Sequence, residues 1–129
     1  MSLENLHELS SLDEFVGVCH EQSVNGGWWD GFCSLNEEAQ LNVLGTKIAL
    51  IHSETSEMME GLRKGKMDDH LPHRTQEEVE AADIFIRLAD YCGRRNIQLP
   101  IIVIEKATYN ADRADHKSAH RAAAGGKKF

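Results

Sequence analysis

A long run of apolar side chains at alternating three- and four-residue steps is the feature that most constrains how this chain folds. The run comprises Leu41, Leu44, Ile48, Ile51, Thr55, Met58 and Leu62. Such steps place side chains on one face of an α-helix, whereas a half-buried strand has apolar residues at every second position. The run therefore predicts one helix of about six turns that ends near Gly65.

Three capping-box patterns predict where helices begin. In this pattern a Ser or Thr hydroxyl and a Glu carboxylate three residues later each bond a backbone N–H that has no partner in the helix. The pattern occurs at Ser11 with Glu14, at Ser34 with Glu37, and at Thr75 with Glu78. We expect the first helix to end before residues 25–27, which are Asn-Gly-Gly, and the third to stop at Gly93.

The segment from Ile101 to Ile104 is a run of β-branched residues that propensity alone would assign to a strand. Pro100 suits the first position of a helix, and an isolated strand would have no partner in an otherwise helical chain. We therefore expect a fourth helix here. The sequence predicts an all-α fold, a bundle of about four helices in a single domain over residues 1–129, with a mobile tail over residues 116–129.

Charge, hydropathy and cysteine spacing limit which partners and which cellular compartment suit this chain. The net charge of -7 argues against nucleic-acid binding, because proteins that bind polyanions concentrate Lys and Arg on one face. No apolar run is long enough to span a bilayer, and the N-terminus is too polar for a signal peptide. Cys19, Cys33 and Cys92 lack CxxC spacing, which favours reduced thiols over a zinc site or disulfides. We expect a soluble, cytoplasmic protein without a membrane partner.

Two pairs of acidic residues are the candidates for a functional site: Glu54-x-x-Glu57 late in the long helix and Glu80-x-x-Asp83 early in the next helix. Residues three apart share a helix face, so antiparallel packing would bring all four acids together. Hard divalent cations, Mg²⁺ or Mn²⁺, would relieve their repulsion. Asp83 strengthens this interpretation because it stands in an apolar run, where a carboxylate needs a partner. For either pair alone, the alternative interpretation is an acidic helix face exposed to solvent. For the second pair, a further alternative is an ordinary contact between Asp83 and Arg87 one turn later.

These motifs also carry a family resemblance. The run from Lys47 to Gly65, followed by the second acidic pair, resembles the ExxE and ExxD signature of MazG-like, all-α nucleoside triphosphate pyrophosphohydrolases. The resemblance extends from about residue 36 to residue 113. It implies hydrolysis of a nucleoside or deoxynucleoside triphosphate, such as dCTP, dUTP or dGTP, to a monophosphate and pyrophosphate. It also implies that the metal-binding residues are Glu54, Glu57, Glu80 and Asp83.

Basic segments extend the resemblance towards the substrate. Lys106-x-x-x-Asn110-x-x-Arg113 is similar to a family segment whose basic and amide groups contact the phosphates or the sugar. A charged helix exterior is the alternative interpretation of these three residues. The closing Lys127 and Lys128 look like the end of short family members, in which lysines fold over the nucleotide.

The mechanism expected from this resemblance combines metal ions with the carboxylates. One metal would orient or deprotonate a water for in-line attack, and another would neutralise the departing pyrophosphate with help from Lys106 or Arg113. Glu54 is the carboxylate that we expect to help activate the water. Ser53 stands where many family members carry a further Glu, so a role for that extra carboxylate is not carried over.

The adjacent tryptophans Trp28 and Trp29 are candidates for stacking on the nucleobase, because an aromatic face binds any base with little hydrogen-bond demand. Tryptophans in small helical proteins are more often core or interface anchors, and we expect that role for at least one of the pair. We include Trp28 among the candidates for substrate binding.

The apolar stripe from Leu41 to Leu62 is longer than the first or third helix can cover at ordinary helix lengths. The apolar segments around residues 84–89 and 101–104 also need neighbours on more than one side. A second copy of the chain would supply them, so we expect a homodimer with nucleotide pockets at or near the interface. The resemblance leaves a dimer of dimers open.

Two rival functions explain parts of the pattern. A di-iron carboxylate bundle needs Glu-x-x-His motifs on two helices, and this spacing occurs only at Glu4 and His7. A non-catalytic, acidic helical interaction module explains the apolar stripes equally well. It does not explain the carboxylate of Asp83 within an apolar run.

Overall fold

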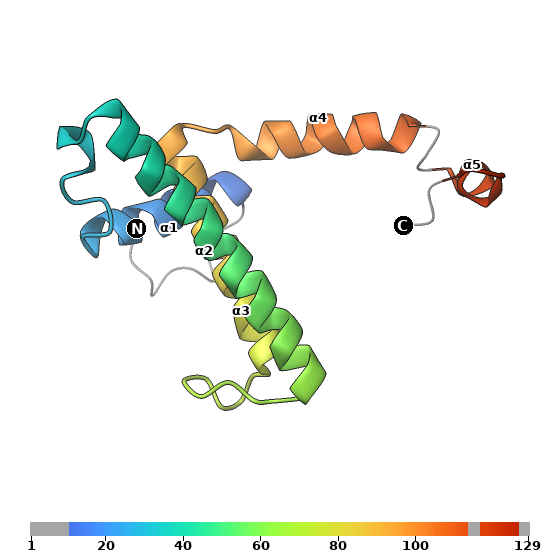
Figure 1. The fold of residues 1–129 in the computed structure, drawn as a ribbon, viewed down its shortest axis with the longest axis horizontal. Coiled ribbons are helices and arrows are strands. Elements are labelled where there is room, and N and C mark those ends of the chain that lie inside the picture. Colours follow the sequence, from blue (N-terminus) through green and yellow to red (C-terminus); the bar gives the residue numbers. More distant parts are fainter. Residues whose placement is uncertain (1–10, 114–116, 127–129) are drawn as a thin grey trace. The chain divides into compact units, whose positions relative to one another are not determined.

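The computed structural model describes residues 11–113 and 117–126, and every regular element within these ranges is a helix (Figure 1). Four long α-helices account for most of them, and an isolated bridge joins Met67 to Thr75. The expected all-α class is therefore confirmed. The chain divides into two compact units, one up to Ile97 and one from Gln98. Each unit is described by itself, and the single domain stays a prediction.

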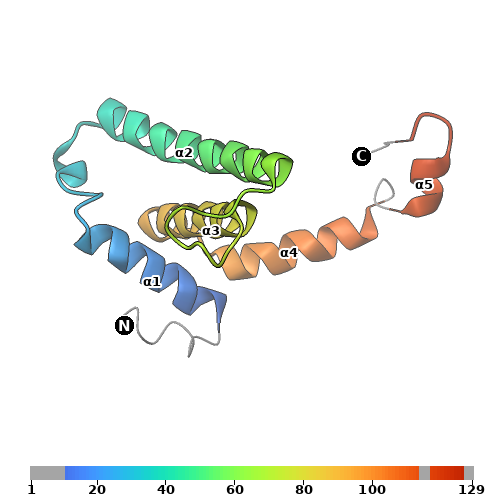
Figure 2. The same ribbon diagram turned by 90° about the horizontal axis from the view of Figure 1, so that it is seen from below.

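The first unit contains three α-helices and one 3-10 turn. These are α1 (Leu12–Asn25), η2 (Phe32–Ser34), α2 (Glu37–Lys64) and α3 (Gln76–Arg95). Helix α3 packs against both α1 and α2 (Figure 2). Helices α2 and α3 run antiparallel: Gly61 near the end of α2 meets Gln76 at the start of α3, while Glu54, about two turns earlier in α2, bonds Arg87 later in α3. This is the arrangement under which the two acidic pairs were expected to converge.

The capping predictions are confirmed at two of the three helix starts. Ser11 with Glu14 and Thr75 with Glu78 form complete capping boxes. The prediction of a box at Ser34 is wrong, because Ser34 is the last residue of η2 and α2 begins only at Glu37. Asn36 caps α2, and its Oδ1 accepts a 2.9 Å hydrogen bond from the N–H of Ala39. An Asn side chain satisfies that N–H as well as a Ser hydroxyl does.

Helix ends show where glycine acts as a stop and where it does not. Gly65 ends α2 in the left-handed conformation, as expected, with φ of 59°. The prediction that Gly93 stops the third helix is wrong, because α3 continues to Arg95 and Asn96 provides the left-handed cap at φ 52°. Gly93 instead lies where α1 crosses α3. A Cβ there would lie 2.5 Å from the Cβ of His20.

The second unit contains α4 (Leu99–Asp112) and the short α5 (Ser118–Ala122). Pro100 lies in the first turn of α4, and the β-branched run 101–104 is helical, as expected. No residue of α4 is buried. Helix α5 falls within the predicted tail of residues 116–129, whose mobility stays a prediction. None of the described helices combines the length and apolar character needed to cross a membrane.

The core of the first unit is small and does not follow the apolar stripe of α2. Its buried apolar residues are Val18, Cys19, Trp29, Leu44, Ala89 and Cys92. Within the stripe only Leu44 is buried, whereas Leu41 and Leu62 are 61% and 64% exposed. The reason is that α2 turns a neighbouring face to α3, the face that carries Glu54 and Gly61. Most of the stripe is therefore exposed or only half-buried.

Candidate metal centre and adjoining pocket

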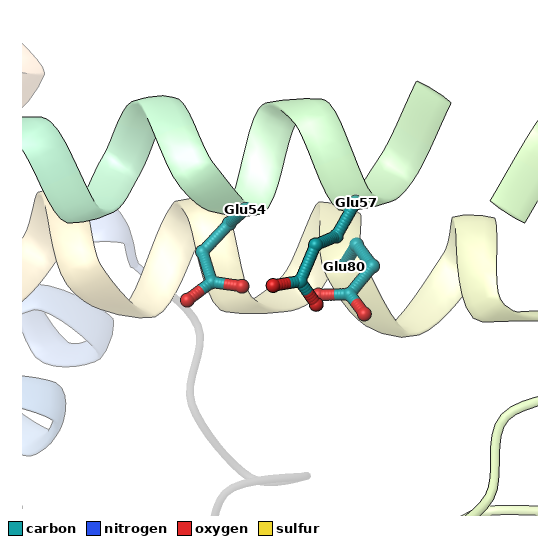
Figure 3. Close-up of side chains that lie close together, drawn as sticks. All are labelled: Glu54, Glu57 and Glu80. Carbon is teal, nitrogen blue, oxygen red and sulfur yellow. The ribbon is translucent and has the colours of Figure 1, made fainter. Parts of the chain in front are cut away.

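Three glutamates meet between the antiparallel helices α2 and α3. Glu54 and Glu57 are one turn apart on α2, and Glu80 lies opposite them on α3. Each offers a carboxylate oxygen, and these oxygens all lie within 4.8 Å of one another (Figure 3). Three of the four predicted metal ligands are therefore brought together. We call these three residues the glutamate cluster.

Burial and the closeness of its members make it unfavourable for all three glutamates of the cluster to be ionised together. Glu54 and Glu80 are each only 7% exposed, whereas Glu57 is open to solvent. Burial raises the pKa of Glu80 to about 7, and a hydrogen bond with Glu54 and the charge of Glu57 add to this effect. Oxygen ligands that repel one another in this way are suited to a hard divalent cation.

Asp83 lies one turn beyond Glu80 but outside the glutamate cluster. Its side chain is half-buried. Burial raises the pKa of Asp83, the charge of Glu54 raises it further, and the charge of Arg87 lowers it. Asp83 and Arg87, both within the described residues, form no hydrogen bond with each other, and Arg87 instead donates its Nε–H to Oε1 of Glu54 at 2.5 Å. Asp83 is thus close to the cluster and faces the pocket described next.

A pocket of about 340 Å³ lies among α1, α2 and α3. Its lining joins Asp83 and Arg87 of α3 to Lys47 of α2 and to Trp28 of the loop that follows α1. Trp28 is 70% exposed, and the Nζ of Lys47 lies 5.5 Å from the centre of its ring. The pocket therefore offers an accessible aromatic ring and two cationic side chains close to the glutamate cluster.

A buried carboxylate, that of Asp90, holds the wall of this pocket in place. It accepts hydrogen bonds from Nδ1 of His20, Oγ of Ser23 and Nε1 of Trp29, each at 2.8 Å. Asp90 thereby ties α1 and the following loop to α3. Trp29 is 6% exposed, which confirms that one tryptophan of the pair is a core anchor.

Arg87 and Asp90 both belong to this site, although neither was among the site residues expected from the sequence. Both continue the spacing that begins at Glu80 and Asp83, since positions 80, 83, 87 and 90 follow steps of three, four and three residues. Such steps keep side chains on one helix face. Extending the acidic pair by two further turns would have found them.

The remaining substrate-binding candidates belong to the second unit or lie outside the described residues. Lys106 Nζ lies 4.6 Å from the ring centre of Tyr109, and the guanidinium of Arg113 lies 5.8 Å from it. The Oδ1 of Asn110 is buried and has no hydrogen-bond partner within the described part of the chain. Their contact with a substrate stays a prediction. Lys127 and Lys128 lie outside the described residues.

The fold and the site together define a class: an all-helical unit in which carboxylates from two antiparallel helices meet beside a pocket. Comparison with protein-family models, with curated proteins and with solved structures found no match for this chain.

Proposed function

We propose that the chain is a cation-dependent, MazG-like pyrophosphohydrolase that cuts a nucleoside or deoxynucleoside triphosphate at the α-phosphorus. The observation that carries the proposal is the glutamate cluster, whose oxygens lie within 4.8 Å of one another on two antiparallel helices. Its members fall on the ExxE and ExxD positions of that family. The products would be a monophosphate and pyrophosphate.

The residues of the cluster fit Mg²⁺ or Mn²⁺, because each offers a carboxylate oxygen as a ligand. Burial, together with the neighbouring Glu54 and Glu57, raises the pKa of Glu80, and a cation would relieve this. Glu54, Glu57 and Glu80 would hold the cation, with Asp83 beside them. When bound, the cation supplies Lewis acidity and neutralises phosphate charge.

The chain's own residues supply position and proton transfer. Glu54 takes the proton of the attacking water, whose oxygen bonds to the α-phosphorus while the bond from that phosphorus to the bridging oxygen of pyrophosphate breaks. Lys106 and Arg113 are the candidates that neutralise the departing pyrophosphate, with Asn110, Lys127 and Lys128 as further substrate contacts. These assignments follow from the family resemblance.

Trp28 is proposed to stack on the nucleobase. Its ring is exposed and lines the pocket beside the cluster, and stacking on an aromatic face suits any base. Trp29 is excluded from this role by its burial against Asp90.

A homodimer or a dimer of dimers is proposed as the functional unit. The apolar stripe of α2 is largely exposed, with Leu41, Ile48 and Leu62 at 61%, 42% and 64%. Exposed apolar surface of this extent is typical of a protein interface. A second copy of the same helix is the partner that symmetric pairing favours.

A cytoplasmic location is proposed from the cysteines. Cys19, Cys33 and Cys92 are all free thiols. Burial raises the pKa of Cys19 and of Cys92, which keeps both protonated. Free thiols without a disulfide suit a reducing compartment.

The proposal is tested with a panel of all common NTPs and dNTPs, each offered with magnesium, with products separated by chromatography. We expect one or a few nucleotides to yield a monophosphate and pyrophosphate, and chelation of the metal to stop the reaction. If no nucleotide reacts and magnesium does not change the melting temperature, the acidic interaction module becomes the better account.

A further inference from the structure

Arg87 contacts both the glutamate cluster and the adjoining pocket. Its Nε–H is bonded to Glu54 of the glutamate cluster at 2.5 Å, and its side chain also lines the 340 Å³ pocket. The side chain is 40% exposed, so it can turn without displacing a packed core. Glu54, by contrast, is held in place by burial.

The guanidinium of Arg87 is only partly used by this contact. Arginine has five N–H donors in a planar fork that matches carboxylate or phosphate oxygens in pairs. Within residues 11–113 and 117–126, only the Nε–H of Arg87 makes a hydrogen bond. The terminal amino groups are therefore available to an anionic ligand.

The charges around Glu54 explain how a cation could displace Arg87 from its contact with Glu54. Glu54, Glu57 and Glu80 lie together, and Arg87 is the cationic side chain that bonds one of them. A divalent cation on the same carboxylates would compete with Arg87 for the oxygens of Glu54. Arg87 then loses its carboxylate partner at the edge of a pocket that already contains Lys47.

We propose that Arg87 exchanges partners: it pairs with Glu54 while the cluster holds no divalent cation, and it binds a phosphate group of the ligand in the pocket once the cluster holds one. The inference rests on the proposed function and adds an order of binding to it. Phosphate recognition by Arg87 becomes available only after the carboxylates are occupied. By linkage, the cation and the phosphate each strengthen binding of the other.

The test measures how Arg87→Gln changes the affinity for inorganic phosphate and for a deoxynucleoside monophosphate, with and without magnesium, by calorimetry. With magnesium we expect the affinity for both to fall about tenfold, as is typical for loss of a charge-assisted contact. Without magnesium the variant and the wild type should differ less than about twofold, because Arg87 is then paired with Glu54. The corresponding deoxynucleoside, which has no phosphate, should be unaffected by the substitution.

Two controls keep this result interpretable. Arg63→Gln removes a matched arginine of α2 that pairs with Glu60 away from the pocket, and it should change neither affinity. Arg87→Lys keeps the charge without the fork and should retain part of the affinity. Independently, the side-chain Nε–H signal of Arg87 in NMR spectra should shift when magnesium is added to the wild-type protein.

Two other results would distinguish failure of the partner exchange from failure of the proposed function. An Arg87→Gln effect of equal size with and without magnesium, or no effect in either case, overturns the exchange while magnesium binding to the cluster still supports the enzyme. If magnesium binds to neither the wild type nor Arg87→Gln, the exchange and the proposed cation site fail together.

Discussion

Glu57 and Asp83 are held differently by the fold, and both are expected to be essential. Glu57 belongs to the glutamate cluster and is exposed, whereas Asp83 is half-buried beside it. We predict that Glu57→Gln or Asp83→Asn lowers turnover by at least about a hundredfold, since each removes a charge that positions the cation. Helicity, measured by circular dichroism, should not change.

The matched control for these variants is Glu60→Gln. Glu60 also lies on α2, but it pairs with Arg63 and Lys64 away from the cluster. Its loss should leave turnover nearly unchanged. Wild-type rates for both Glu57→Gln and Asp83→Asn at saturating magnesium would contradict the carboxylate site.

Glu80 gives the fold a pH dependence in the absence of a divalent cation. Its pKa is raised from the ordinary 4.5 to about 7 in the folded protein, so the folded state binds the proton more tightly than the unfolded state. Stability contributed by this proton should be present near pH 4.5 and fall as the pH rises to about 7. Urea midpoints measured with a chelator should show this fall.

Glu80→Gln provides the comparison, because its amide keeps the shape of the protonated acid without titrating. The fall between these pH values should be smaller in the variant, and magnesium should reduce it in the wild type. Midpoints that fall equally in the wild type and in Glu80→Gln would assign the pH dependence to other groups.

The sequence predicted which acidic residues share a helix face, but not which side chains bond one another across two helices. Spacing of three residues placed Glu54 and Glu57 on one face of α2, and antiparallel packing against α3 brought Glu80 close to them. It could not decide whether Asp83 or Glu54 would bond Arg87, because that choice depends on side-chain directions across two helices. The sequence also could not show which tryptophan would bond Asp90.

At the scale of elements, the close approach of α2 to α3 depends on Gly61. A Cβ at this position would lie 2.9 Å from Cβ of Gln76 and 2.9 Å from the backbone N of Glu77. Because backbone cannot move aside as a flexible side chain can, Gly61→Ala should lower the free energy of unfolding by about 1–3 kcal/mol. Urea denaturation measures the change.

Gly45→Ala is the control within the same helix. Nothing lies within 4 Å of a Cβ built at Gly45. Alanine there should raise stability by about 0.5–1 kcal/mol, because glycine loses more conformational entropy in a helix. If Gly61→Ala proved as stable as Gly45→Ala, close packing at Gly61 would not be what holds the two helices together.

Helix existence could be predicted more fully than helix ends. Periodic spacing and capping patterns predicted the first three long helices, whereas Pro100 and the lack of a strand partner predicted α4 despite its β-branched residues. Ser34 and Asn36 both resemble caps, and local sequence does not reveal that η2 uses Ser34. Gly93 resembles a stop signal, but its actual role is to admit His20 of a neighbouring helix, which is a tertiary contact.

At the scale of the whole molecule, the exposed stripe of α2 predicts self-association. Light scattering over a concentration series should give at least a dimeric mass. Leu62→Glu, which places a charge at a stripe position that is 64% exposed, should shift the mass towards the monomer. A stable monomer with full specific activity at nanomolar concentration would contradict the shared interface.

The bond that is cut tests the central claim most directly. A reactive nucleotide from the panel is incubated with magnesium in ¹⁸O-labelled water without added pyrophosphatase, and the products are examined by ³¹P NMR and mass spectrometry. Attack at the α-phosphorus predicts one label in the monophosphate and unlabelled, intact pyrophosphate, with no reaction by Glu57→Gln. Label in pyrophosphate, or release of orthophosphate with a nucleoside diphosphate, would contradict the proposed pyrophosphohydrolase.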